Sequence, residues 1–359
     1  MAKYKLGILQ GDDIGLEVVP ETVKVLKEAV KPFAGIDIEW VELPVGMPSY
    51  QENGATLPEK TLKTLYDLDG WILGPIGHMA YPKNDPQAVN PHPVLRRDFD
   101  LVSNIRPAKS YDTVPSLHKN VDVVIIRENN EGFQPDRNVY KGSGEFMPTP
   151  DMAMSVRVIT RRNSQMVART AFELARQRNG GKKVTAIHKN TVFKLGCGLF
   201  VDSCREIAGE YPDVTFETAV VDTFAMQLAM RPQNYDVVVS TNMFGDILTD
   251  LAAGLVGGLG MAPGLCVGPK YVMAQATHGS APDIAGKQIA NPYAMIMSGQ
   301  MMLSWLANLK KDEEAVKAAA NIQKAMDEIL ATGEDITPDL GGKASTSQMG
   351  DAICRVLNR

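Results

Sequence analysis

Segments of strand length alternate with segments of helical periodicity along almost the whole chain, and this alternation restricts the fold more than any other feature. Amphipathic stretches of helical period, starting with residues 15–30, separate the strand segments. The segments of strand length are residues 5–9, 36–42, 69–73, 121–126, 183–188, 214–220 and 235–241. Strands that alternate with helices are typical of a sheet covered by helices. The sequence therefore predicts an α/β fold.

The chain lacks the usual signature of a dinucleotide-binding sheet. No Gly-x-Gly-x-x-Gly follows the first strand segment, so a Rossmann site is not indicated. Residues 295–331 and 344–357 have helical periodicity, and we expect them to complete the fold. No internal repeat or low-complexity linker marks a domain boundary.

Composition and charge exclude several classes of protein. The 359 residues include 37 Lys and Arg against 42 Asp and Glu, a net charge of −5, which argues against non-specific nucleic-acid binding. No apolar run reaches the roughly 18 residues of a membrane span, and the N-terminus lacks an apolar signal core, which predicts a soluble cytoplasmic protein. The four cysteines lack C-x-x-C spacing, so buried free thiols are expected rather than disulfides or a zinc site.

Two aspartates four residues apart follow the last of these strand segments. On a helix, Asp246 and Asp250 lie on one face, one turn apart, beside an apolar stripe. Two like charges beside a core need a counter-charge, which a divalent cation with oxygen ligands supplies. Asp222 opens the preceding helical segment and can approach them across the intervening strand. Three aspartates without His or Cys favour Mg2+ or Mn2+ over zinc, and the alternative is a solvated helix edge with unrelated aspartates.

Several basic side chains are candidates for binding an anionic substrate. Arg127 directly follows an apolar strand segment, and Arg96 and Arg106 lie close together within residues 95–107. Guanidinium groups bind carboxylates through paired hydrogen bonds, so three arginines suit a dicarboxylate. Lys189 also follows a strand segment, and among arginines and a metal its pKa would fall toward that of a general base. Taken singly, each of these residues can equally be part of a surface salt bridge.

In combination, these motifs resemble the decarboxylating β-hydroxyacid dehydrogenases, the family of isocitrate, 3-isopropylmalate, homoisocitrate, tartrate and D-malate dehydrogenases. The resemblance runs from Gly11–Glu17 to Asp339–Gly342. It implies two α/β domains around a central cleft, with residues 1–101 and 257–359 forming a discontinuous cofactor domain and residues 102–256 an inserted domain. It also implies a homodimer with a shared active site, to which Lys189 and Asp222 contribute in trans.

The resemblance also implies a role for each of these side chains. Arg96, rather than its neighbour Arg97, would bind substrate carboxylates together with Arg106 and Arg127. Lys189 and Asp222 would be catalytic. The metal ligands would be Asp222, Asp246 and Asp250.

A further segment is similar to the adenosine-binding loop of the family. Asp283 accepts hydrogen bonds from ribose hydroxyls and repels a 2′-phosphate, and NADP-preferring bacterial relatives carry Lys-Tyr at Asp283 and Ile284, so NAD is expected. The residues that match the loop are His278, Gly279, Ser280, Ala281, Asp283, Ile284 and Asn291.

The chain departs from the family pattern at two positions. Gln134 stands where the family has a tyrosine that helps to protonate the enol after decarboxylation, and Tyr140 or water is the alternative donor. Gln275 replaces a usual glutamate. Asn90 and His92 lie where the family discriminates substrates, and they match neither the isocitrate nor the isopropylmalate pattern. The substrate is therefore an unidentified substituted D-malate, and oxidation without decarboxylation or a non-catalytic regulatory subunit are alternatives.

Overall fold

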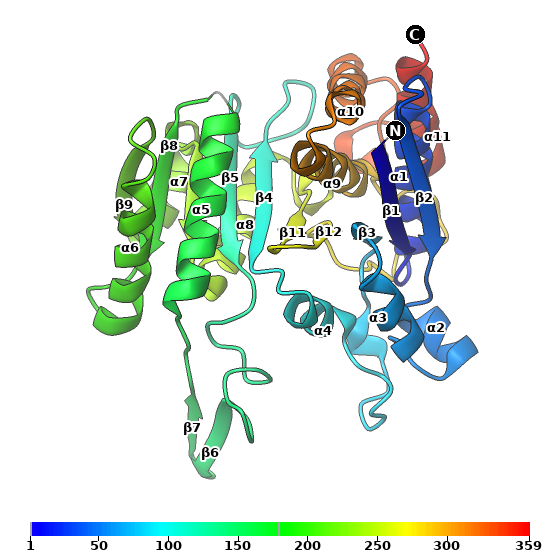
Figure 1. The fold of residues 1–359 in the computed structure, drawn as a ribbon. Helices are drawn as coiled ribbons and strands as arrows, with labels where there is room; N and C mark the ends of the chain where they lie inside the picture. Colours follow the sequence, from blue (N-terminus) through cyan, green and yellow to red (C-terminus); the bar gives the residue numbers. More distant parts are fainter. Residues whose placement is uncertain (1, 179) are drawn as a thin grey trace.

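A mixed sheet of ten strands runs through the centre of the protein (Figure 1). The computed structural model describes residues 2–178 and 180–359. In spatial order the strands are β2 (Ile36–Glu42), β1 (Ala2–Leu9), β3 (Gly70–Leu73), β12 (Val272–Ala274), β11 (Leu265–Val267), β4 (Ser103–Lys109), β5 (Asp122–Glu128), β10 (Val237–Ser240), β8 (Lys183–His188) and β9 (Thr215–Val220). The predicted α/β class is confirmed.

Two parallel halves of the sheet meet at an antiparallel junction. β2, β1, β3 and β12 run parallel, as do β5, β10, β8 and β9. Between them, β11 pairs antiparallel with β12 and β4, and β4 pairs antiparallel with β5. The two parallel halves therefore run in opposite directions. A separate antiparallel hairpin, β6 (Glu145–Thr149) and β7 (Met152–Ser155), projects from the sheet (Figure 1).

Helices cover both faces of the sheet. On one face, α9 packs over β11 and β12, and α5 packs over β5 and β10. On the other face, α4 packs beside the ends of β3, β11 and β12, and α8 packs over β4 and β5. The helices are α1 (Gly15–Val30), α2 (Gly46–Asn53), α3 (Glu59–Leu65), α4 (Pro91–Asp98), α5 (Arg161–Gln177), α6 (Lys194–Ala208), α7 (Val221–Met230), α8 (Asn242–Val256), α9 (Tyr293–Lys310), α10 (Glu313–Thr332) and α11 (Thr346–Leu357).

The helical periodicity predicted over residues 295–331 is confirmed, and it is divided between two helices. The segment forms two helices, because the backbone of Lys311 turns into the left-handed region with φ of 54°. Asp312 then caps α10, since its carboxylate accepts hydrogen bonds from the backbone N–H groups of Glu314 and Ala315. The break allows α10 to fold back against α9, and both helices contribute to the main core.

The two halves of the sheet come from different parts of the chain. The five strands from β2 to β11 come from residues before 102 or after 256, and the five from β4 to β9 come from residues 102–256. The assignment of these segments to two domains stays a prediction. Cys197, Cys204, Cys266 and Cys354 are all free thiols, as predicted, and the first three are buried. Across the described residues, every helix is too short or too polar to span a membrane.

Helix α8 lies unusually close to β5. A Cβ atom at Gly245 would lie 2.8 Å from Cγ and 2.9 Å from Cβ of Arg127. Farther along the same helix, a Cβ atom at Gly254 would meet nothing within 4 Å. The close approach at Gly245 therefore sets how near the aspartates of α8 can come to β5.

Replacing Gly245 with alanine tests this close contact. We expect Gly245→Ala to destabilise the fold by about 1–3 kcal/mol, because α8 or Arg127 must move. Gly254→Ala is the matched control, and it should be neutral or stabilise by about 0.5–1 kcal/mol through helix propensity. Denaturant unfolding of both variants measures the difference, and equal stabilities would contradict the packing described here.

Candidate active site

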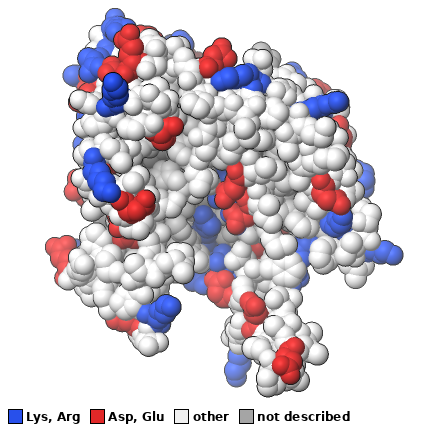
Figure 2. Space-filling view, turned by 180° about the vertical axis from the view of Figure 1, so that it is seen from behind, with Lys and Arg blue, Asp and Glu red and all other residues white. Residues whose placement is uncertain are grey.

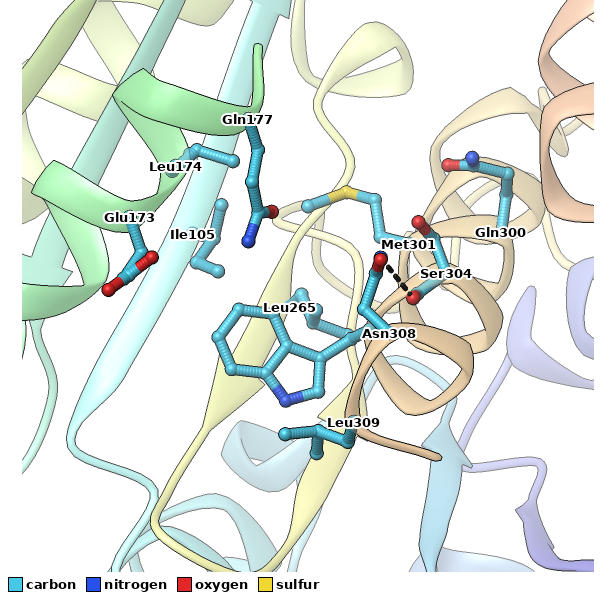
Figure 3. Close-up of a pocket in the computed structure, with 11 residues that line it drawn as sticks. Ile105, Glu173, Leu174, Gln177, Leu265, Gln300, Met301, Ser304, Asn308 and Leu309 are labelled. Atoms are coloured by element: carbon cyan, nitrogen blue, oxygen red, sulfur yellow. Dashed lines mark hydrogen bonds between the residues drawn. The ribbon is translucent and has the colours of Figure 1, made fainter. Parts of the chain in front are cut away.

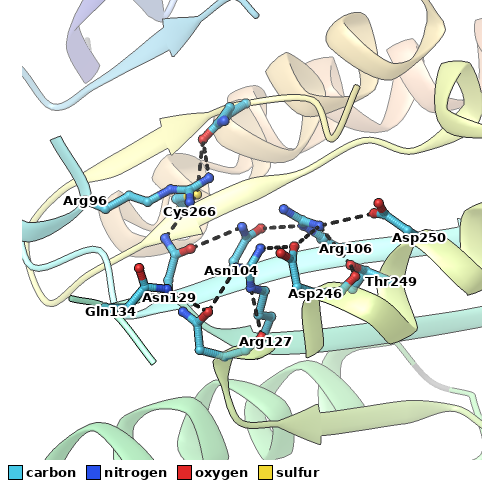
Figure 4. Close-up of polar contacts among 12 residues, drawn as sticks. Arg96, Asn104, Arg106, Arg127, Asn129, Gln134, Asp246, Thr249, Asp250 and Cys266 are labelled. Carbon is cyan, nitrogen blue, oxygen red and sulfur yellow. Dashed lines mark hydrogen bonds and ion pairs between the residues drawn. The ribbon is translucent and has the colours of Figure 1, made fainter. Parts of the chain in front are cut away.

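Three arginines from three different elements gather on the α8 face of the sheet (Figure 4). Arg96 lies on α4, Arg106 on β4 and Arg127 on β5. The side chains of Arg106 and Arg127 are 10% and 7% exposed. Arg97, by contrast, is exposed and pairs with its neighbour Asp98 at 3.0 Å. The helical turn of α4 thus brings Arg96 into the cluster and leaves Arg97 outside it.

The two aspartates of α8 supply the counter-charge for this cluster. Arg127 forms a hydrogen-bonded ion pair with Asp246. Arg106 lies 3.6 Å from Asp246 and 3.7 Å from Asp250, and it donates to the hydroxyl of Thr249 at 2.8 Å. The aspartate side chains are 53% and 58% exposed, so their outer oxygen atoms are accessible. This arrangement fits a hard divalent cation, because Mg2+ binds through one or two carboxylates and completes its shell with water or substrate.

Burial and mutual repulsion shift the pKa values of the cluster. Burial, followed by the charge of Arg106, lowers the pKa of Arg127 to about 9, and burial with Arg96 lowers the pKa of Arg106. Both groups still carry their charge at neutral pH. Burial, with repulsion from Asp246, raises the pKa of Asp250. The Nε atom of Arg96 is buried and has no hydrogen-bond partner among the described residues. An anionic ligand would offset the crowded positive charge of the cluster.

Gln134 belongs to the same cluster through Asn242, a residue to which the sequence analysis gave no role. Arg127 donates to Oδ1 of Asn242 at 3.0 Å, and Nε2 of Gln134 donates to the same oxygen at 3.0 Å. Because a guanidinium group only donates, Oδ1 must be the acceptor and the amide of Gln134 is fixed. Tyr140, the alternative proton donor, is fully exposed in this chain. A polar residue at the start of an apolar helix was the one available signal for Asn242.

Lys189 and Asp222 form a separate pair. Lys189 follows β8 and its ammonium group donates to Asp222 on α7 at 2.7 Å, which lowers the pKa of that carboxylate. Within one chain the ion-pair partner of Lys189 is Asp222, and the predicted contribution of both residues to the site of a second copy stays a prediction. Asp222 does not join Asp246 and Asp250, and the described residues contain no group of three metal-binding side chains. Helices α7 and α8 do pack against each other, but Asp222 at the start of α7 pairs with Lys189 instead of joining the two aspartates of α8.

The predicted adenosine loop begins three residues after Gln275. Ser280 is buried and its carbonyl accepts the backbone N–H of Ile14 at 3.1 Å, while Asp283 is exposed. The side chains of Thr277 and His278 each keep a buried polar atom without a partner in the described chain. The amide of Asn291 is already engaged with Asp339 and with the backbone of Tyr293. The exposed carboxylate of Asp283 and the unpaired atoms of Thr277 and His278 fit a nucleotide, whereas the side-chain amide of Asn291 bonds to other residues of the chain.

Asn90 and His92 lie at the start of α4. The side chain of Asn90 caps this helix by accepting the backbone N–H of His92 at 3.1 Å. The imidazole of His92 contacts the amide of Gln275, and the same amide accepts a hydrogen bond from Arg96 at 3.1 Å. His92, which the sequence analysis predicted to discriminate substrates, therefore lies next to the arginine cluster, and Gln275 connects His92 with Arg96.

Two surface features lie near the sheet. Seen from behind, the protein has a hollow in which Lys and Arg side chains lie close to Asp and Glu (Figure 2). A cavity of about 400 Å3 opens between α5 and α9, over Ile105 and Leu265 (Figure 3). Alternate residues of a strand point to opposite faces, so this cavity lies across the sheet from Arg106 and Cys266. Among the described residues, its lining mixes apolar and polar side chains and includes Glu173 but no lysine or arginine, so the cavity does not suit a dicarboxylate.

Two buried carboxylates hold the segment that carries Gln134. Glu128 accepts the backbone N–H groups of Asn130 and Glu131 at 2.7 and 2.9 Å. Glu131 accepts both the backbone N–H and the hydroxyl of Thr160 at 2.8 Å. Burial, followed by repulsion from Glu128, raises the pKa of Glu131 to about 7.

Comparison with known proteins agrees with this architecture. The family described as isocitrate/isopropylmalate dehydrogenase matches residues 5–353. The 3-isopropylmalate dehydrogenase of Methanothermobacter thermautotrophicus is 40% identical over 99% of both chains. The isocitrate/homoisocitrate dehydrogenase of Thermus thermophilus is 38% identical over 99% of this chain and 98% of that protein. The crystal structure of isocitrate dehydrogenase from Methylococcus capsulatus superposes with a TM-score of 0.86 at 37% identity, covering 99% and 100% of the chains.

The fold and these relatives define the class of protein as an oxidoreductase of the dehydrogenase type. The chain belongs to the isocitrate/isopropylmalate dehydrogenase family. The resemblance inferred from the sequence motifs is confirmed.

The pKa of Glu131 generates a pH-dependent test of stability. A raised folded-state pKa means that the contribution of Glu131 is fully present below about pH 4.5 and is lost as pH rises through about 7. Relative to Glu131→Gln, the wild type should lose roughly 2–3 kcal/mol of unfolding free energy between pH 5 and 8. Denaturant unfolding measures this, with the exposed Glu334→Gln as control. A pH-independent difference would show that Glu131 ionises normally.

Proposed function

We propose that the protein catalyses the NAD- and divalent-metal-dependent oxidative decarboxylation of a substituted D-malate. The observation that carries this proposal is the convergence of Arg96, Arg106 and Arg127 beside Asp246 and Asp250. Three guanidinium groups match the two carboxylates of a malate, and the aspartates match the oxygen ligands of Mg2+ or Mn2+. Family membership supports the dehydrogenase chemistry.

The arginines bind and orient the substrate. Arg106 and Arg127 are nearly buried and are held by α8, so their guanidinium groups are pre-positioned, and Arg96 is held by Gln275. Holding both carboxylates fixes the hydroxyl-bearing carbon against the nicotinamide. A divalent metal held by Asp246 and Asp250 would polarise the oxygen bound to the carbon that is oxidised.

Lys189 is the proposed general base, and we propose that it acts on the site of a second copy. Within one chain it pairs with Asp222 rather than with the arginine cluster. A homodimer that places Lys189 and Asp222 next to the arginines of the other copy would supply that site with both the general base and the third metal ligand. Lys189 would take the hydroxyl proton while hydride leaves the adjacent carbon for NAD.

Gln134 bears on the chemistry after the oxidation step. Its amide nitrogen is committed to Asn242, and an amide cannot exchange a proton usefully, so Gln134 cannot take over the role of a tyrosine as a proton donor. This favours, as a second candidate, oxidation without decarboxylation. A non-catalytic regulatory subunit is the remaining alternative. Retention of the arginines, the aspartates and Lys189 supports an enzyme.

A substrate panel tests the proposal. Purified protein with NAD and Mn2+ is mixed with isopropylmalate, isocitrate, homoisocitrate, tartrate and D-malate, while nicotinamide absorbance and carbon dioxide release are recorded. Equal amounts of reduced cofactor and carbon dioxide support oxidative decarboxylation. Reduced cofactor without carbon dioxide would favour simple oxidation, and no turnover with any malate would favour the regulatory role.

The first functional prediction concerns the metal. Asp246→Asn should lower both Mn2+ affinity and turnover at least about a hundredfold, because a charged ligand and the partner of Arg127 are lost together. Asp202→Asn, an exposed change on α6, is the control and should leave both unchanged. Mn2+ titration calorimetry with substrate present, together with turnover, measures the effect. Full activity in a chelator would refute the metal requirement.

The second functional prediction concerns the cofactor. A 2′-phosphate facing Asp283 should weaken NADP binding, so kcat/KM should favour NAD by about tenfold or more. The double variant Asp283→Lys with Ile284→Tyr should narrow or invert this preference. Asp67→Lys, the same charge change at another exposed position, should not. Equal kcat/KM values of the wild type for both cofactors would rule out the proposed role of Asp283.

A further inference from the structure

We infer that Gln275 is a positioning residue that holds His92 as an uncharged N–H donor beside the substrate, so that the site prefers a malate substituent with a neutral hydrogen-bond acceptor, such as a hydroxyl, over a third carboxylate. This inference rests on the proposed function. The hydrogen-bond polarity at His92 would select the substituent on the malate, which the sequence motifs did not identify.

The orientation of the Gln275 amide follows from Arg96. Arg96 donates to Oε1 of Gln275 at 3.1 Å, and a guanidinium group has no acceptor. The other end of the amide, Nε2, must therefore face His92, whose Nε2 lies 2.9 Å away. An amide NH2 group only donates, so Nε2 of His92 accepts and carries no proton. The imidazole proton is consequently on Nδ1.

The surroundings of His92 keep the ring uncharged. Burial, followed by the positive charge of Arg96, then His78 and Arg106, lowers the pKa of His92 well below its usual value. The charged and titratable groups facing the ring are thus basic. A protonated ring would also lose its hydrogen bond from Gln275, because Nε2 could no longer accept. The hydrogen bond from Gln275 and the surrounding positive charge therefore both favour the uncharged ring.

The Nδ1–H group of His92 is available to a ligand. It has no hydrogen-bond partner in the described part of the chain, and it is not among the polar atoms sealed from solvent. Asn90 cannot serve instead, since its side-chain oxygen caps α4. Gln275 touches both His92 and Arg96, so a malate whose carboxylate is bound by Arg96 has its substituent within the neighbourhood of His92.

A glutamate at position 275 would reverse this polarity. Its carboxylate would still accept from Arg96, but toward His92 it could only accept, so Nε2 would need a proton. That charge pair stabilises the imidazolium form. The Nδ1–H group of an imidazolium is a charge-assisted donor, which would improve binding of a substituent that carries a third carboxylate. Gln275→Met has similar length without the hydrogen bonds, and it separates loss of positioning from reversal of charge.

The direct test is the protonation state of His92 by NMR. The chain contains five histidines, so long-range 1H–15N spectra of 15N-histidine protein are tractable, and loss of one signal in His92→Asn assigns the ring. We expect the neutral Nδ1–H tautomer between about pH 6 and 8 in the wild type and a protonated ring in Gln275→Glu. A wild-type His92 that is protonated, or carries its proton on Nε2, overturns the inference whether or not any malate is turned over.

The functional test compares two malates. The ratio of kcat/KM for a 3-hydroxyl substituent to that for a 3-carboxymethyl substituent should fall about tenfold or more in Gln275→Glu. In Gln275→Met both values should fall without that reversal, and the exposed Gln233→Glu control should match the wild type. An unchanged ratio in Gln275→Glu contradicts the inference. Failure of the wild type on both malates, with the expected NMR signal present, would instead count against the proposed function.

Discussion

The burial of guanidinium groups on one face of the sheet is the constraint on which the site depends. Removing such a cation from water costs several kcal/mol unless anions and hydrogen bonds replace the solvent. Arg106 and Arg127 obtain part of this compensation from Asp246 and Asp250, which requires α8 to pack closely enough for Gly245 to touch Arg127. The remaining positive charge of the cluster favours an anionic ligand.

Two side-chain amides are oriented by the arginines of this cluster. Arg127 fixes Asn242 and through it Gln134, and Arg96 fixes Gln275 and through it His92. In each case an arginine, which can only donate, determines which end of an amide faces the next group. The arginines of the cluster therefore set the direction of these hydrogen bonds, and a substitution at either amide changes chemistry as well as shape.

The sequence predicted individual helices and strands better than the antiparallel region where the two halves of the sheet meet. Local patterns identified β1, β5, β8 and α8, and the spacing of Asp246 and Asp250 placed them on one helix face, because such patterns depend on neighbouring residues. The antiparallel strands β11 and β12 have only three residues each, too few for a clear pattern. The pairing of Lys189 with Asp222 and the contact of Gln275 with His92 depend on tertiary packing, which spacing alone does not contain.

The proposal that one active site is built from two copies has the most direct test, because a single chain keeps the pair of Lys189 and Asp222 apart from the arginine cluster. Lys189→Met and Asp246→Asn should each abolish turnover alone. When the two variants are co-expressed, each mixed dimer contains one intact site, so activity should recover to about a quarter of the wild-type value. Recovery is the result that our account predicts, and mixed dimers without activity, verified by mass spectrometry, would contradict it.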